Sequence, residues 1–347
     1  MRDAHLSSAL APAGAAAPDF GALLPPASPR AVAPLPQPVF REIAPAAPSL
    51  HALQGIVLLG GSVWMSGFRA AIGRPVLDLP ITSDRTLLQI WCERIAGLNE
   101  SLGRHLPLRV VVSHGAPMPV SALPPAPSMP RVIVERDASA YRGTGGVLRD
   151  MAVNEDRVLA DDSAGDPDAC LFVANAAQLP LEPLFPLVRQ LAQCDTDLSF
   201  VAHYDGTPSR LMLIRAQCLR VLPRVGFVDL MEQGLPIIAR EHRVTALHRA
   251  NPISLPVRTM EGYIQALQRY HRGAGDPPKG SGEDWRCSFA LVEEAADVHP
   301  SACVHDAVVL RGGRVERDAV VARSVVCPGG VVRRGEVVVD QLICPGR

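Results

Sequence analysis

The C-terminal part of this chain repeats itself every 17 residues, and this repeat limits the possible folds more than any other feature. The segments that begin at Asp306, Arg323 and Asp340 read DAVVLRGG, RSVVCPGG and DQLICPG, so aliphatic residues precede a proline- or glycine-containing turn each time. Aliphatic residues also recur six positions apart, as at Val309 and Val315. About six residues per flat face and three faces per coil are typical of a parallel β-helix. We therefore predict a short β-helix of about three coils at this end of the chain.

The repeat also predicts which side chains are neighbours. Residues one coil apart lie at the spacing of paired strands. The expected stacks are Val308, Val325 and Leu342 in one column, and Leu310, Cys327 and Cys344 in another.

The middle of the chain alternates between apolar strands and helices. Helical spacing of Leu87, Leu88, Trp91, Ile95 and Leu98 predicts a helix over residues 84–102, with Ser83 or Asp84 as its N-cap. Aliphatic runs predict buried strands at 56–59, 108–113, 131–135 and 170–174. Long apolar strands between helices indicate an α/β domain with a doubly wound, mostly parallel sheet that is covered on both faces.

Composition divides the chain into four predicted parts. Residues 1–50 are rich in alanine and proline and are expected to form a disordered leader, either a passive tail or a partner-binding arm. The α/β domain is expected to span residues 51–272, and a linker rich in glycine, proline and charge to span 273–284. The β-helix would occupy residues 285–347.

Charge and cysteine usage exclude several classes of function. The net charge of the 347 residues is −1, which gives no basic surface for nucleic acid or an anionic membrane. The eight cysteines form no C-x-x-C pair or zinc-like spacing, so we expect reduced thiols and no metal site built on them. The sequence has neither an apolar run of about 18 residues nor a signal peptide, and we expect a cytoplasmic protein.

Two glycine-rich turns and one strand end are the candidates for a ligand site. A glycine turn after the first strand, a second at the start of a helix, and an asparagine that ends strand 170–174 would all lie beyond the carboxyl ends of strands, where open α/β sheets bind ligands. An ordinary tight turn remains the alternative interpretation of the first glycine pair. The candidate nucleotide-binding residues are Gly60, Gly61, Ser62, Gly143, Thr144, Gly145 and Asn175.

From Gly55 to Arg347 the chain resembles the nucleoside-diphosphate-sugar pyrophosphorylases, the nucleotidyltransferase family that includes mannose-1-phosphate guanylyltransferase. The resemblance lies in LLGG, YRGTGGVLRD, LFVANAAQL, GFVDLMEQGLP, TMEGYIQAL and the hexapeptide tail, which occur in the family's order. It implies a doubly wound nucleotide-binding domain followed by a left-handed β-helix. It also implies that a sugar 1-phosphate and a nucleoside triphosphate are joined, with Mg²⁺ and fixed cations neutralising the phosphates.

The resemblance is weakest at the residues that perform this chemistry. Met65 occupies the position of the family's arginine after the first strand, and Val76 that of a lysine. Ala177 and Pro256 occupy the positions of the two metal-binding aspartates. The only lysine of the chain, Lys279, falls in the linker.

Three functional hypotheses remain open. The first is a divergent pyrophosphorylase of sugar-nucleotide or polysaccharide precursor synthesis, with Arg69, Arg74 or Arg142 as phosphate clamps and Asp78 or Asp229 as ligands of Mg²⁺. The second is a catalytically inactive regulatory or scaffold protein that binds a nucleotide or NDP-sugar without any metal. The third is a protein whose β-helix mediates homo-oligomerisation and which binds no nucleotide. The replaced positions favour the second, and we expect little or no pyrophosphorylase activity.

Overall fold

A computed structural model describes most of the chain between residues 50 and 346. The described residues are 50–60, 67–121, 128–137, 141–153, 169–203, 206–273 and 288–346. All of them belong to one compact unit, Ala47–Arg347. The predicted leader, apart from Leu50, and the predicted linker, apart from Gly273, fall outside the described residues, and the domain boundaries stay predictions.

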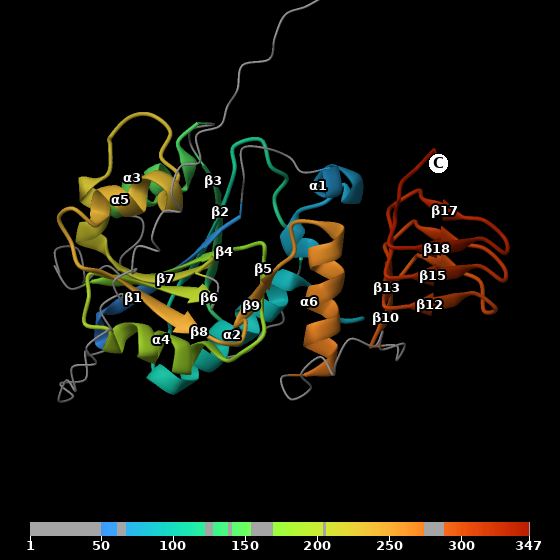
Figure 1. The fold of residues 1–347 in the computed structure, drawn as a ribbon, viewed down its shortest axis with the longest axis horizontal. Coiled ribbons are helices and arrows are strands. Elements are labelled where there is room, and N and C mark those ends of the chain that lie inside the picture. Colours follow the sequence, from blue (N-terminus) through green and yellow to red (C-terminus); the bar gives the residue numbers. More distant parts are fainter. Residues whose placement is uncertain are drawn as a thin grey trace, which may run out of the picture. The chain divides into compact units, whose positions relative to one another are not determined.

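A mostly parallel sheet of seven strands organises the α/β part, as the apolar strands predict (Figure 1). Its order is β3-β2-β1-β4-β7-β6-β8, and only β7 runs antiparallel to its neighbours. The strands are β1 (Leu53–Leu59), β2 (Leu108–Val112), β3 (Val132–Arg136), β4 (Cys170–Asn175), β6 (Leu198–His203), β7 (Pro208–Arg215) and β8 (Val244–Arg249). Because β7 is reversed, its first residues lie at the edge where β4 ends.

Helices cover both faces of this sheet because its strands are apolar on both sides. In β1, Ile56 and Leu58 belong to a core with α2, α4 and α6, whereas Val57 and Leu59 belong to a second core with α3 and α5. The helices are α1 (Gly67–Ile72), α2 (Leu87–Leu102), α3 (Gly143–Val153), α4 (Leu184–Gln193), α5 (Leu235–Ile238) and α6 (Met260–Arg272). Short turns of 3-10 helix lie at η1 (Leu50–Ala52), η2 (Val76–Asp78) and η3 (Ala216–Val221), and η4 (Leu230–Gly234) is a π-helical turn.

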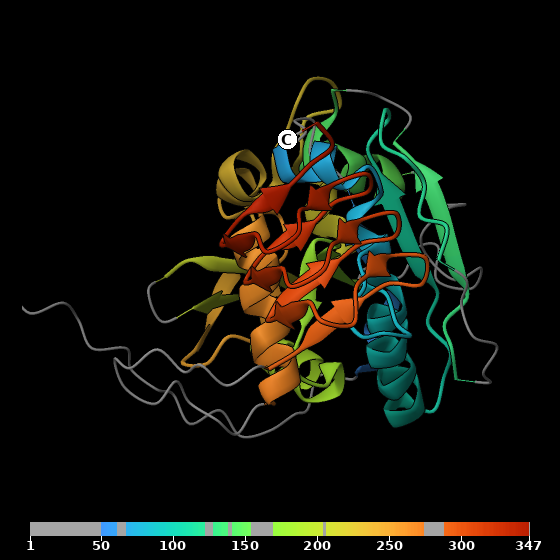
Figure 2. The ribbon, with the colours of Figure 1, turned by 90° about the vertical axis from the view of Figure 1, so that its right-hand side faces the viewer.

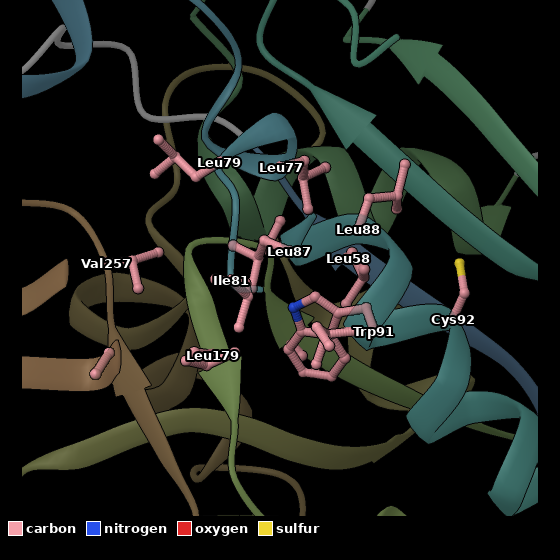
Figure 3. Packing of buried hydrophobic residues seen from close by; sticks show 14 of the residues in the cluster. Leu58, Leu77, Leu79, Ile81, Leu87, Leu88, Trp91, Cys92, Leu179 and Val257 are labelled. Atoms are coloured by element: carbon pink, nitrogen blue, oxygen red, sulfur yellow. The ribbon is translucent and has the colours of Figure 1, made fainter. Parts of the chain in front are cut away.

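The first core is built around α2. Figure 3 shows Trp91, which is fully buried, among Leu58 of β1 and Leu87 of the same helix. The helix begins at Leu87, later than the sequence predicts, and its N-cap is Thr86. The Thr86 N–H donates to the Gln89 side chain over 2.7 Å. The two predicted caps, Ser83 and Asp84, therefore both lie before the N-cap, and the Asp84 carboxylate accepts from Thr82 Oγ1 at 2.7 Å.

The C-terminal part consists of three small parallel sheets through which the chain passes in turn (Figures 1 and 2). One sheet holds β10 (Ala290–Val292), β13 (Ala307–Val309), β16 (Val325–Val326) and β19 (Leu342–Ile343). The second holds β11 (Asp297–Val298), β14 (Arg314–Val315) and β17 (Val331–Val332). The third holds β12 (Cys303–His305), β15 (Val320–Ala322) and β18 (Val337–Val339).

The strand register confirms the 17-residue repeat. Val308 pairs with Val325, and Val325 pairs with Leu342, as the first predicted column requires. In the second column, the N–H of Leu310 donates to the carbonyl of Val326, the residue before Cys327, and the N–H of Cys327 donates to that of Ile343, the residue before Cys344, as parallel pairing at a 17-residue offset requires.

The six-residue spacing marks the buried side chains of this region. Val309, Val315 and Val321 come from three different sheets, yet all are buried in one cluster. The residues that begin the repeats, Asp306 and Arg323 among them, have positive φ values of 48° and 46°. Such left-handed corners turn the chain from one face to the next.

Candidate functional site

The C-terminal edge of the large sheet is where the strand ends predicted to bind ligand converge. Gly60 follows β1, and its N–H donates to the Val111 carbonyl over 2.7 Å. A Cβ at Gly60 would lie 3.1 Å from that oxygen and 3.3 Å from the Val112 side chain, so a larger residue here would have to displace its neighbours by a few tenths of an ångström. Gly61 and Ser62 lie outside the described residues, and their contact with a ligand stays a prediction.

The second glycine turn packs against the chain rather than standing open. Gly143 has a φ of +68°, and a Cβ there would lie 2.5 Å from the Val228 carbonyl oxygen. That carbonyl accepts a hydrogen bond from the N–H of Gly145 at 2.8 Å. The N–H of Gly145, a candidate donor to a nucleotide, is therefore already bonded within the protein.

Thr144 likewise contacts the segment that follows Val228. Its hydroxyl accepts from the Leu230 N–H at 2.9 Å and donates to Asp229 Oδ2 at 3.4 Å. The other oxygen of Asp229 accepts from the N–H groups of Met231 and Glu232, at 2.9 and 3.0 Å. Asp229 thus caps η4, and Thr144 joins the start of α3 to this cap.

Arg74 and Asp78, two further candidates, have structural partners. Arg74 forms a two-point ion pair with Glu293, with distances of 2.7 and 2.8 Å. Asp78 is buried, and its carboxylate accepts from the N–H groups of Val120 and Ser121 and from the Ser121 hydroxyl. These contacts hold a loop and a distant segment in place, and any role in catalysis stays a prediction.

Arg142 is buried in a network of its own. It binds Asp150 with two bonds of 2.6 and 2.7 Å and also donates to the carbonyls of Gly226 and Pro223. Its hydrogen bonds and charge lower the pKa of Asp150. The guanidinium predicted as a phosphate clamp therefore supports the 223–226 loop. Arg69, in α1, is half-buried, and burial lowers the pKa of its guanidinium.

Asn175 lies where the sequence predicts, at the end of β4. It is buried, and its Oδ1 accepts from the N–H of Ala177 at 2.9 Å, which turns the chain at the strand end. Ala177 in turn accepts from Val257, at 3.0 Å. The turn after β4 therefore fixes the segment that leads into α6.

Two arginines that the sequence analysis did not select lie at this same edge. Arg210 precedes Leu211, which pairs with Ala174, so it lies where β4 ends at Asn175. Arg258 follows Val257, which is bonded to the turn after Asn175. Burial and the positive charge of Arg210 lower the pKa of Arg258, while Asp229 opposes this shift.

The signal for Arg258 was present in the sequence, two residues after Pro256, in the segment whose family counterpart holds a metal ion. The positions of the family's two metal-binding aspartates lie at this edge as well. Ala177 and Pro256 offer no carboxylate, and Pro256 pairs through the small sheet of β5 (Gln178–Pro180) and β9 (Ser254–Pro256). Within the described ranges, no three His, Cys, Asp or Glu side chains gather to hold a metal ion.

Comparisons with known proteins give fold likenesses only. No protein-family model matches the chain, and no curated protein sequence matches it. HddC from Yersinia pseudotuberculosis is similar over 62% of this chain and 99% of its own, with 13% identity and a TM-score of 0.43. Rv0371c from Mycobacterium tuberculosis H37Rv is similar over 62% of this chain and 98% of its own, with 19% identity and a TM-score of 0.41. The function is therefore argued from the site itself.

Proposed function

We propose that this chain is a nucleotidyltransferase-like protein of sugar-nucleotide or polysaccharide precursor synthesis that binds a nucleotide or an NDP-sugar with weak or no catalysis. The observation that carries the proposal is the meeting of Gly60, Asn175, Arg210 and Arg258 at the C-terminal edge of the large sheet. Ligands of open α/β sheets bind outside the carboxyl ends of the strands. Positive charge at such an edge suits an anionic, phosphate-bearing ligand.

Weak catalysis is proposed because the candidate catalytic side chains have other partners. Arg74, Asp78 and Arg142 are engaged in ion pairs or loop contacts, and Asp229 caps a helical turn. Transfer to a nucleoside triphosphate brings several negative charges together, and removing one stabilising donor commonly costs about a hundred- to a thousandfold in rate. A regulatory or scaffold protein that binds a nucleotide is the alternative within the same proposal. Mg²⁺ enters only if the protein proves to be active.

Calorimetric titration with GDP-mannose and UDP-glucose tests binding. Asn175→Asp adds a negative charge at the strand edge but keeps the oxygen that accepts from Ala177, so we expect it to weaken binding at least tenfold. Gln54→Glu is the matched control because it makes the same isosteric change near the start of β1, at the opposite edge. If neither compound binds, or if both variants bind like the wild type, the proposed site is wrong.

A pyrophosphate-release assay tests catalysis separately. With Mg²⁺, a sugar 1-phosphate and a nucleoside triphosphate, we expect a rate close to that of heat-unfolded protein. Turnover well above this blank would show an active enzyme and would refute the pseudoenzyme part of the proposal.

The C-terminal sheets are proposed to form a left-handed β-helix that joins copies of the chain. The outer side of β18 supports the joining of copies, because Val337 and Val339 are 65% and 39% exposed there. Pairing of this side with a second copy would remove apolar surface from water. Light scattering should show an oligomer that Val337→Lys with Val339→Lys converts to monomer. A monomeric wild type would refute the proposal.

Among the described helices, none is long and apolar enough to cross a membrane.

A further inference from the structure

We infer that Arg210 and Arg258 form an anion site that holds a diphosphate group directly, without a divalent metal ion. The inference rests on the proposed function in one respect, that the diphosphate belongs to a nucleotide or an NDP-sugar. It goes further in naming the group that is bound and the charge that balances it.

The backbone places both arginines around the turn that follows β4. On one side, Leu211 pairs with Ala174, so Arg210 lies beside the end of β4. On the other side, Val257 donates to Ala177, so Arg258 lies beside the residues just after the strand. The two cations thus flank the same three-residue turn, at the edge where a ligand of this fold would bind.

The backbone of Arg210 is strained. Its φ is +61°, and among the described residues it is the only non-glycine residue inside a strand of the large sheet with a positive φ. The pairing of β7 with β6 is irregular nearby, with a register shift between Phe200 and Ala202. Irregularities of this kind redirect side chains and often occur beside functional sites. Arginine at a position that glycine would occupy more easily points to a need for its side chain.

Like charges act on each other at this edge. The positive charge of Arg210 acts on Arg258, and the Asp229 carboxylate, which opposes that effect, has one oxygen bonded to two backbone amides. Burial removes water that would screen the two positive charges. Burial lowers the pKa of Arg258, and the charge of Arg210 lowers it further. A dianionic group between them would relieve the repulsion, and guanidinium groups bind phosphate oxygens in a two-point geometry.

Binding of the diphosphate should not require a metal ion, because the two arginines supply the positive charge. In a magnesium site, carboxylates hold the ion and the ion holds the phosphates. Here the protein supplies cations, so Mg²⁺ would compete with the arginines for the phosphate oxygens. Binding should therefore persist in EDTA and weaken as Mg²⁺ is added, which is the reverse of a metal-dependent site.

The experiment is calorimetric titration of the full chain with sodium pyrophosphate, GDP-mannose and UDP-glucose, in EDTA and in Mg²⁺. We expect Arg258→Gln and Arg210→Gly each to weaken binding of pyrophosphate and of any NDP-sugar that binds at least tenfold. Arg323→Gly is the matched control because it also replaces an arginine with a positive φ, far along the chain in the C-terminal sheets. It should change affinity less than twofold.

Thermal unfolding of the same variants separates a binding role from a structural one. Glycine relieves the strain at residue 210, so Arg210→Gly should keep or raise the melting temperature while it weakens binding. A lower melting temperature with unchanged affinity would make Arg210 a structural residue and overturn the inference. If Arg258→Gln fails to fold, Arg210→Gly alone decides the result.

The outcomes distinguish the two proposals. If the NDP-sugars bind but need Mg²⁺, or bind equally to both variants, the inference is wrong and the proposed function stands. If pyrophosphate binds through the arginines and neither NDP-sugar binds, the anion site stands and the proposed function fails. If none of the three compounds binds in EDTA or in Mg²⁺, both are wrong.

Discussion

Arg74 and Glu293 form a two-point ion pair that joins positions 219 residues apart in the chain, with N–O distances of 2.7 and 2.8 Å. Arg74 precedes η2, and Glu293 directly follows β10 in the C-terminal sheets. Both side chains are largely buried, with exposed fractions of 21% and 17%. The pair is therefore a link between the α/β part and the C-terminal sheets.

Replacing Arg74 by methionine should destabilise the protein without affecting ligand binding. The substitution leaves a largely buried Glu293 carboxylate without its arginine, and we expect the free energy of unfolding to fall by about 1–3 kcal/mol, between the values for exposed and buried pairs. Chemical denaturation measures it. The control is Arg323→Met, which breaks a pair of the same geometry with Asp340 at more exposed positions and should cost less than about 1 kcal/mol. A loss of nucleotide binding in Arg74→Met would instead place Arg74 in the phosphate site.

Replacing Gly143 by alanine should destabilise the protein severely. An added Cβ would lie 2.5 Å from the Val228 carbonyl oxygen, and the positive φ is unfavourable as well. Gly73→Ala separates the two effects, because Gly73 has a similar φ of +63° and open space around it. We expect a loss of about 1–2 kcal/mol for Gly73→Ala and a clearly larger one for Gly143→Ala. Equal melting temperatures for the two variants would show that the backbone at Val228 moves away from the added methyl group at little cost in stability.

Two neighbouring valines of β18 test which side of the strand faces the interior. Val338 is 1% exposed and Val337 is 65% exposed. Val338→Ala should lower the free energy of unfolding by about 1.5–3 kcal/mol, since it removes buried methyl groups and leaves a cavity. Val337→Ala should have almost no effect in the monomer. Similar losses measured in dilute solution would mean that the side chains do not alternate as the register requires.

Two buried thiols should make the free energy of unfolding fall at alkaline pH. Burial raises the pKa of Cys92 and of Cys218 to about 12, from an ordinary value of 9.0. The unfolded chain loses these protons at lower pH than the folded chain, so the free energy of unfolding falls as pH rises from about 9 to 12, by about 1.4 kcal/mol per thiol at pH 10.

The variant Cys92→Ala with Cys218→Ala should therefore lose less stability between pH 8 and pH 10 than the wild type. Urea unfolding at both pH values measures the difference. Cys303→Ala, at an exposed position, should leave the wild-type drop unchanged. Identical drops in the double variant and the wild type would show that these thiols ionise in the folded protein.

The sequence alone determined the parts of the structure that depend on local periodicity. The 17-residue offset predicts that Val308, Val325 and Leu342 are neighbours, because each coil repeats the same length and the same inward-facing residues. Apolar strands that alternate with helices along the sequence predict a mostly parallel sheet with both faces covered. Asn175 was predictable at a strand end for the same reason, since a polar residue directly follows a buried aliphatic run.

Only the tertiary structure decided which partner each polar residue has. Nothing near Arg74 in the sequence indicates Glu293, and nothing near Gly143 indicates that Val228 occupies the space beside it. Arg210 was missed for the same reason, and although the position of Arg258 after Pro256 was a signal in the sequence, its meeting with Arg210 was not, because the two come from separate elements that meet only when β7 and β9 are placed around the end of β4. Apolar periodicity is local and repeats along the chain. A hydrogen bond or an ion pair joins two particular atoms, and their distance is set only when the whole chain has folded.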